Sequence, residues 1–194
     1  RIVFGVAGSH ADKFLLGLLD SVGGIGVYTI GQRIANVVFV FMTAIQNVYA
    51  PQVYRRMFDL GVSGGEAIGR YLTPFLYVST GAGLLMGLWA EEIVSLMLPT
   101  AYHDAPPVIA ILSMLYVTYF FGKQPQLTYA KKTHVISWLT LLGIIINVLV
   151  MYPCIVMWGV VGAAWGALIG GGITAALTFF LSQRHYAIRW EYGR

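Results

Sequence analysis

The sequence predicts an all-α integral membrane protein, a bundle of about six transmembrane helices. Of the 194 residues, 58% are hydrophobic and 10% are charged, and the mean hydropathy is +0.73. An average soluble domain carries about 25% charged residues, so this chain has too few to cover its apolar surface with groups that water solvates. The apolar residues also gather into six runs, most of them close to the roughly 20 residues that cross a hydrocarbon core.

The first two runs are defined by the residues that interrupt or end them. The first is apolar except for Asp12 and Lys13, and a glycine-rich turn over residues 20–26 separates it from the second. The second ends at Pro51, because proline removes a backbone donor and breaks an ordinary helix. Since no initiating methionine or signal peptide precedes the first run, we expect the chain to be the C-terminal part of a longer protein.

The other four runs complete the bundle and leave no room for a separate soluble domain. The third passes through Glu91 and Glu92, and the fourth begins at Pro106 and Pro107, where a first helical turn needs no backbone N–H. Residues 153–159 separate the fifth from the sixth. In order, the predicted spans cover residues 2–19, 27–50, 71–98, 106–122, 135–152 and 160–181.

The basic residues predict the orientation of the bundle. Nine of the twelve Lys and Arg residues fall in alternate connections and in the C-terminal tail, and the remaining connections contain none. Cytoplasmic loops carry the excess of basic residues, so we expect these connections and the C-terminus to be cytoplasmic. The nine residues are Arg55, Arg56, Arg70, Lys123, Lys131, Lys132, Arg184, Arg189 and Arg194.

Two bases, Lys13 and Arg33, and one acid, Asp12, lie inside the first two predicted spans. At about 1.5 Å per residue, Asp12 and Arg33 share a depth on neighbouring antiparallel helices, about 12 Å and 10 Å from the turn between them. Charges inside a membrane usually face a bundle interior or a watery cavity, which favours a functional site. The structural alternatives are an ion pair of Asp12 with Arg33 or Lys13, and a Lys13 side chain that reaches the outer interface.

A polar stripe runs along the second predicted span. At about 100° per residue its members fall within roughly one quadrant of a helix, which favours a wet lumen. Isolated hydrogen bonds between helices, which contribute about 0.6 to 2 kcal/mol each, are the alternative. The stripe consists of Thr29, Gln32, Arg33, Asn36, Thr43 and Asn47. A weaker stripe on the fifth span lines the same cavity or packs between helices, and it consists of Thr133, Ser137, Thr140 and Asn147.

The sixth span carries small residues at a spacing of four. Gly162, Gly166 and Gly170 form a repeated small-xxx-small ladder. Such ladders let two helices approach closely inside a membrane. We therefore expect these glycines to serve helix packing, with a mobile gate as the lesser alternative.

Several classes of function are not expected. The four histidines are scattered, and no metalloprotease, nucleophile-elbow or phosphate-loop spacing is present, so we do not expect an enzyme. Cys154 is the only cysteine, which excludes an internal disulfide and disfavours a thiolate metal site. No cofactor or metal is expected. The bases lie between hydrophobic runs, which argues against a nucleic-acid partner.

Three segments, ADKFLLGLL, GVYTIGQRIANV and APQVYRR, resemble the seventh and eighth helices of bacterial polysaccharide flippases. The family has an acid–base pair followed by Ile/Leu-Gly, then Gly-hydrophobic-Tyr, a base in the next helix and a Pro at its inner end. The matching positions here are Asp12 and Lys13, Gly17, Gly26 and Tyr28, Arg33, and Pro51. LPTAYHDAPPVIAIL and WGVVGAAWGALIG resemble later segments of the same family, which exports lipid-linked O-antigen and other oligosaccharides. The flippase family belongs to the multidrug/oligosaccharidyl-lipid/polysaccharide exporter superfamily.

The resemblance implies two bundles of about six helices around a central cavity, and this chain is similar to the second. The first, N-terminal bundle lies outside this sequence. The family moves undecaprenyl-diphosphate-linked oligosaccharides across the bacterial inner membrane by alternating access. Besides this substrate, the expected partners are membrane lipids and a coupling ion, H⁺ or Na⁺.

The resemblance also implies roles for the charged residues. We expect Arg33, assisted by Lys13, to attract the diphosphate. Asp12 would hold the bases while the cavity is empty, or take part in ion coupling. The other residues expected to line the cavity are Thr29, Gln32, Asn36, Asn47 and Asn147.

Two other functions stay open at this point. A cation-coupled multidrug antiporter of the same superfamily would favour acids over bases inside the spans, whereas here the bases outnumber the acids two to one. A non-transporting membrane scaffold for envelope synthesis would have dry, paired charges and no cavity.

Overall fold

The computed structural model describes residues 12–19, 22–122, 125–129 and 133–188, and every regular element within them is helical. The predicted all-α class is therefore confirmed for this part of the chain. Residues 2–11 of the first predicted span lie outside it. After a helical segment over residues 12–19, the elements are α2 (Val22–Leu60), the 3-10 turn η1 (Gly61–Gly64), α3 (Gly65–Leu88), α4 (Ala90–Met97), η2 (Thr100–Tyr102), α5 (Pro106–Gly122), α6 (Pro125–Tyr129) and α7 (Thr133–His185).

Three stretches are long and apolar enough to cross a membrane, namely Gly23–Leu60, Gly65–Leu88 and His134–His185. A fourth apolar helix, Pro106–Phe120, is shorter. A hydrocarbon core is about 30 Å thick and needs about 20 apolar residues to cross it. The chain is therefore a membrane-associated protein.

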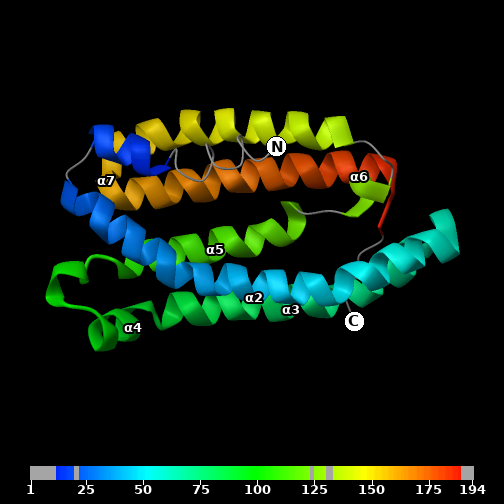
Figure 1. Ribbon diagram of the computed structural model, residues 1–194, viewed down its shortest axis with the longest axis horizontal. Helices are drawn as coiled ribbons and strands as arrows, with labels where there is room; N and C mark the ends of the chain where they lie inside the picture. Colours follow the sequence, from blue (N-terminus) through cyan, green and yellow to red (C-terminus); the bar gives the residue numbers. More distant parts are fainter. Residues whose placement is uncertain (1–11, 20–21, 123–124, 130–132, 189–194) are drawn as a thin grey trace.

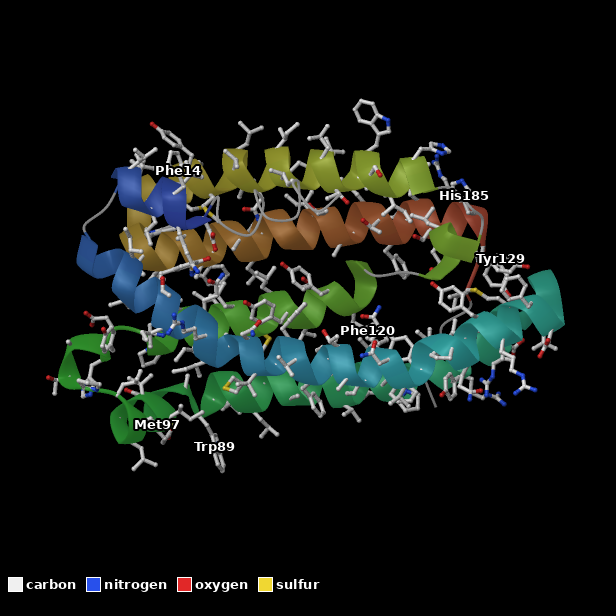
Figure 2. The ribbon with its side chains drawn as sticks, viewed as in Figure 1. Phe14, Trp89, Met97, Phe120, Tyr129 and His185 are labelled. Carbon is white, nitrogen blue, oxygen red and sulfur yellow. The ribbon has the colours of Figure 1, made fainter. Side chains whose placement is uncertain are left out.

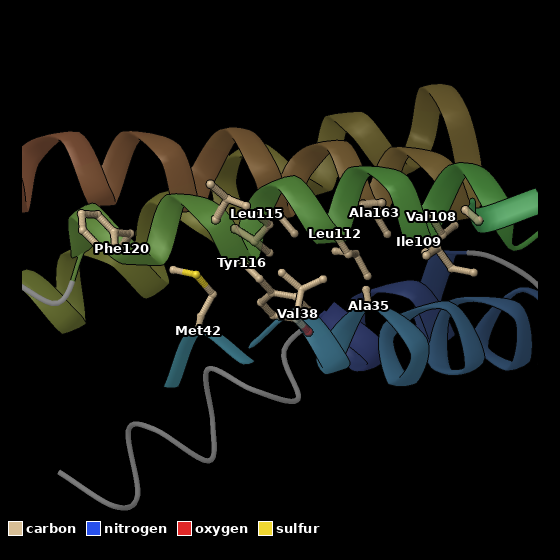
Figure 3. Packing of buried hydrophobic residues seen from close by; sticks show 14 of the residues in the cluster. Ala35, Val38, Met42, Val108, Ile109, Leu112, Leu115, Tyr116, Phe120 and Ala163 are labelled. Atoms are coloured by element: carbon tan, nitrogen blue, oxygen red, sulfur yellow. The ribbon is translucent and has the colours of Figure 1, made fainter. Parts of the chain in front are cut away.

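The long helices lie side by side along the long axis of the molecule (Figure 1). α5 occupies the centre, where it packs against α2, α3 and α7. It is the shortest of these helices, and its sequence contains no charged residue. Its buried side chains, Val108, Ile109, Leu112 and Tyr116 among them, meet Ala35 and Val38 of α2 (Figure 3). α5 therefore holds the neighbouring helices together.

α2 is longer at both ends than the second predicted span. The glycine-rich turn predicted over residues 20–26 is wrong from Val22 onwards, because the helix has already begun there. A Cβ atom added at Gly17 would lie 3.2 Å from the Ile25 side chain, so the segment 12–19 packs closely on this part of α2. The contact offsets the low helix propensity of glycine, about 1 kcal/mol per residue relative to alanine.

The predicted helix end at Pro51 is also wrong, because α2 continues through this proline to Leu60. An interior proline removes one backbone hydrogen bond, here the one to the carbonyl of Asn47. Membrane helices tolerate this loss because neighbouring groups can pair with the freed carbonyl. With 39 residues at about 1.5 Å each, α2 is about 58 Å long and exceeds the thickness of the hydrocarbon core.

α7 consists of two helices that meet at Gly159. The connection predicted over residues 153–159 is shorter than expected, because helix continues through Pro153 and only Gly159 leaves helical geometry, at φ 53° and ψ −129°. This positive φ suits glycine, which has no Cβ to clash. The chain reverses there, so the two halves of α7 form a hairpin.

The glycine ladder lies along the contact between the two halves of α7. A Cβ atom at Gly162 would overlap the carbonyl of Cys154, and one at Gly170 would lie 2.9 Å from the Cα of Asn147. At Gly166 the nearest atom would be the Cα of Met151, at 2.5 Å. All three neighbours are backbone atoms that cannot move aside, so the ladder serves helix packing.

Residues that follow α7 fold back onto the turn between α2 and α3. The Tyr186 hydroxyl donates a 2.6 Å hydrogen bond to the carbonyl of Gly61, 125 positions away in the sequence. The Gln183 side chain accepts a 2.8 Å hydrogen bond from the Ile188 N–H and donates a 3.3 Å bond to the Ile188 carbonyl. We call Gln183, Tyr186 and Ile188 the C-terminal latch.

Aromatic contacts extend the C-terminal latch to α6. The Tyr129 ring lies edge-on to both Phe58 and Tyr186, at centroid distances of 5.1 and 5.8 Å. Burial, with a smaller effect of Tyr129, raises the pKa of Tyr186 above its ordinary value of 10.0. The latch thus joins three segments at the end of the molecule that carries Arg55, Arg56, Arg70 and Arg184.

Alanine substitutions at two glycines of α7 should have opposite effects. Alanine favours helix over glycine by about 1 kcal/mol at either site. At Gly166 the new methyl meets the backbone of Met151, whereas at Gly172 no atom lies within 4 Å. Overpacking costs about 1–3 kcal/mol. Thermal unfolding in detergent should show a lower midpoint for Gly166→Ala and an equal or higher one for Gly172→Ala. Equal shifts in both variants would contradict the packing role.

Tyr186→Phe should loosen the C-terminal latch. It removes the donor to Gly61, which contributes about 0.5–1.5 kcal/mol. Because the pKa of Tyr186 is raised in the folded chain, the stability it contributes is complete below about pH 10 and is lost as the pH rises further. Hydrogen exchange of residues 61–65 should be faster in Tyr186→Phe at neutral pH and less sensitive to alkali. Tyr152→Phe, an exposed tyrosine of α7, is the matched control.

Candidate functional site

A buried carboxylate lies at one end of the bundle, where the segment 12–19 crosses α2. Asp12 is only 8% exposed. Its Oδ2 accepts a 3.0 Å hydrogen bond from the Tyr28 hydroxyl and a 3.1 Å bond from Gln32 Nε2. Its Oδ1 accepts a 2.9 Å bond from the backbone N–H of Lys13. Among the described residues the carboxylate therefore has three donors, and all of them are uncharged.

The spacing along α2 explains why Tyr28 and Gln32 act together. Residues four apart lie on the same face of a helix, one turn above the other. Both side chains therefore face the segment 12–19. Arg33 follows Gln32 at about 100° further around the helix and points away from this contact.

The ion pair of Asp12 with Arg33 or Lys13, one of the two structural alternatives, is not formed. Within the described residues the one salt bridge is the exposed pair Arg55–Asp59, at 3.7 Å. Arg33 is exposed and Lys13 is partly buried. The equal depth of Asp12 and Arg33 was not sufficient for pairing, because the rotation of α2 turns Tyr28 and Gln32, rather than Arg33, toward Asp12.

Aromatic rings of α5 and α2 lie near the carboxylate, whose charge acts on both Tyr116 and Tyr119. Tyr116 and Tyr119 are 5.8 Å apart between ring centroids, and Phe39 lies 5.5 and 6.0 Å from them. Tyr116 is buried. The polar site around Asp12 thus continues into an aromatic cluster between α2 and α5.

A pocket opens further along the same contact between α2 and α5. The pocket is shallow and has room for about one water molecule. Thr43 donates its hydroxyl to the Phe39 carbonyl at 2.9 Å, whereas Gln46 has no hydrogen-bond partner within the described part of the chain. The lining consists of Phe39, Met42, Thr43, Gln46, Tyr49, Tyr119 and Phe120.

One member of the polar stripe of α2, Thr43, lines this pocket. Thr29, Gln32 and Thr43 are partly buried, and Gln32 bonds to Asp12. Arg33, Asn36 and Asn47 are exposed. The stripe is therefore divided between helix contacts and the exposed surface of α2.

Asn147, the predicted cavity residue of the fifth span, lies in the α7 hairpin. A Cβ atom at Gly170 would come within 3.2 Å of its side-chain nitrogen, so Asn147 packs on the glycine ladder. Thr140, another member of that weaker stripe, donates its hydroxyl to the carbonyl of Ile136 at 2.8 Å. The Asn147 contact favours the packing alternative for the fifth span, whereas the Thr140 bond lies within one helix and its side chain is exposed.

Tyr28 belongs to one of the motifs noted in the sequence, but its role as a hydrogen-bond donor to Asp12 was not predicted. The i, i+4 spacing of Tyr28 and Gln32 on a helix beside an intramembrane acid was the available signal. The aromatic cluster of Phe39, Tyr116 and Tyr119 carried no such signal, because aromatic residues are frequent throughout the chain.

No protein-family model, curated protein or solved structure matches this chain. Its function must therefore be argued from the residues and their geometry.

Tyr28→Phe should destabilise the bundle, because it leaves a buried carboxylate with one donor fewer. The loss of a partner from a buried polar group costs about 1–3 kcal/mol. Tyr77→Phe is the matched control, since the Tyr77 ring is 69% exposed on α3. Thermal unfolding in detergent should show a lower midpoint for Tyr28→Phe alone. In an Asp12→Asn background the effect of Tyr28→Phe should shrink, and equal effects in both backgrounds would contradict the coupling.

Proposed function

We propose that the chain is one bundle of a membrane transporter that moves a lipid-linked oligosaccharide diphosphate across the bacterial inner membrane by alternating access. The observation that carries the proposal is the state of Arg33. Arg33 is exposed and does not pair with Asp12, which accepts hydrogen bonds from Tyr28, Gln32 and the backbone of Lys13 instead. A base in this state is ready to bind an anion.

The free-energy cost of exposing an arginine to lipid supports the presence of a cavity beside α2. A charged side chain that faces lipid at membrane depth is expensive, so such residues face water or other protein. Arg33 shares the polar edge of α2 with Asn36 and Asn47, which are exposed as well. This edge fits the wall of a cavity between two bundles, with the second wall supplied by a bundle outside this sequence.

Arginine suits a diphosphate better than lysine does. Its planar guanidinium offers parallel N–H donors that match two oxygens of a phosphate group, and it remains charged in all conditions. Lys13 lies one residue from Asp12, in the segment that crosses α2, and would add a second positive charge near the mouth of the site. Thr29 and Gln32 would complete its polar wall.

The arrangement of the helices supports a multi-pass protein. With α7 divided at Gly159, the segment 12–19, α2, α3, α5 and the two halves of α7 would make six spans. Arg55, Arg56 and Arg70 lie near the turn between α2 and α3, and Arg184 lies in the last turn of α7, which the Tyr186–Gly61 hydrogen bond brings to the same end of the molecule. The positive-inside rule would place this end, and the C-terminus, in the cytoplasm.

A second candidate is a cation-coupled multidrug antiporter, and Asp12 is the observation that favours it. Among the described residues no basic side chain pairs with this carboxylate, so a coupling ion or an organic cation would not have to displace one. The nearby rings of Tyr116, Tyr119 and Phe39 would add cation–π attraction. The two candidates differ in the residue that substrate needs, Arg33 for the diphosphate and Asp12 for a cation.

In the intact protein, Arg33→Ala should abolish polysaccharide export, and Arg33→Lys should retain part of it. The loss of charge-assisted hydrogen bonds worth about 1.5–3 kcal/mol predicts a decrease on the order of 10- to 100-fold. Surface polysaccharide, normalised to the amount of protein in the membrane, is the measurement. Arg55→Ala, at an exposed arginine near the opposite end of α2, is the control and should export normally.

Unchanged surface polysaccharide in Arg33→Ala would exclude the flippase. If the same cells also lost resistance to organic cations in Asp12→Asn, the antiporter would take its place.

A further inference from the structure

The short helix α4 has three kinds of surface. Ala90 and Val94 are buried against the bundle. Glu91, Glu92 and Ser95 are exposed and polar. At about 100° per residue these groups occupy separate sectors of the helix, and a third sector, centred between Leu96 and Met97, is apolar. Leu96 is 87% exposed and Met97 is 72% exposed.

The apolar sector of α4 continues the apolar surface of α3. Leu84, Leu85 and Leu88 are exposed near the end of α3, which is one of the three candidate membrane helices. Trp89 lies at the break between α3 and α4 and is 64% exposed. Its side chain points away from the bundle (Figure 2). The exposed leucines, Trp89, Leu96 and Met97 therefore form one surface that passes from the membrane helix onto α4.

We propose that α4 is an interfacial helix, which inserts Trp89, Leu96 and Met97 into the boundary between lipid headgroups and acyl chains and keeps Glu91 and Ser95 in water. Tryptophan is enriched at this boundary, because its ring is apolar and its N–H remains within reach of polar partners. Helices with one polar and one apolar exposed face lie in the plane of the interface. The occupant of the apolar surface is thus the leaflet at the end of α3 remote from the C-terminal latch.

Lipid fits this surface better than a protein partner does. The apolar sector of α4 follows directly on the exposed leucines of α3, which is a candidate membrane helix. The lipid that covers α3 would therefore cover this sector as well. A protein bound to α4 alone would have to displace lipid from Leu88 and Trp89 at the same time. The inference does not rest on the proposed function, because a transporter and a scaffold would both need this end of α3 to be anchored.

Depth measurement with nitroxide labels tests the inference on the whole chain. Cys154 is the only cysteine, so Cys154→Ala supplies a background for single labels at Leu96→Cys and, as the matched control, Glu91→Cys. The protein is reconstituted in vesicles of phosphatidylethanolamine and phosphatidylglycerol. The label at position 96 should collide more often with oxygen, which concentrates in lipid, than with a water-soluble nickel chelate, and the label at 91 should show the reverse.

Two results would overturn the proposal. A label at position 96 with the same nickel accessibility as that at 91 would place the apolar sector in water. A label at 96 shielded from both reagents would indicate a protein contact.

A second measurement needs no cysteine variant. The emission of Trp89, taken as the difference between the wild-type protein and Trp89→Phe, should be quenched several-fold more by lipids brominated near the headgroup than by those brominated at the chain end. Equal or absent quenching would contradict an interfacial position.

Discussion

A carboxylate buried in a membrane protein needs donors from the protein itself, and the way in which Asp12 meets this need shapes the rest of the site. Tyr28 and Gln32 supply neutral donors from one face of α2, which fixes the rotation of that helix against the segment 12–19. The same rotation turns Arg33, Asn36 and Asn47 outward. One set of hydrogen bonds therefore joins two helices, and no acid in the part of the chain that the structure describes pairs with the arginine.

Close packing along the other contacts gives this arrangement a fixed frame. α5 fills the space between α2, α3 and α7 with apolar and aromatic side chains. The α7 hairpin closes through glycine, which allows backbone atoms of its two halves to touch. Inside a membrane, apolar side chains gain little by leaving the lipid hydrocarbon to contact one another. Close packing, rather than the hydrophobic effect, therefore drives helix association.

The features that could be predicted from the sequence are those that depend on one helix at a time. Apolar runs predicted the helices, and the spacing of Gly162, Gly166 and Gly170 predicted a packing face. The partners of Asp12 were not predicted, because depth alone does not separate Arg33 from Tyr28; the i, i+4 spacing of Tyr28 and Gln32 was the local sign of the helical rotation that does. The passage of α2 through Pro51 and the contact of Tyr186 with Gly61 depend on distant parts of the chain, which no local pattern encodes.

The C-terminal latch makes the order of synthesis matter. Tyr186 follows Gly61 by 125 residues, and ribosomes add about 5–20 residues per second, so the turn between α2 and α3 waits about 6 to 25 s for its cover. During that interval the Gly61 carbonyl lacks the Tyr186 hydroxyl, and the backbone at Gly65 lacks Ala187 as a neighbour. During this interval the incompletely synthesised protein differs from the folded one at this turn, and quality-control factors can recognise the difference. The interval ends when Tyr186, which follows α7, packs on the turn.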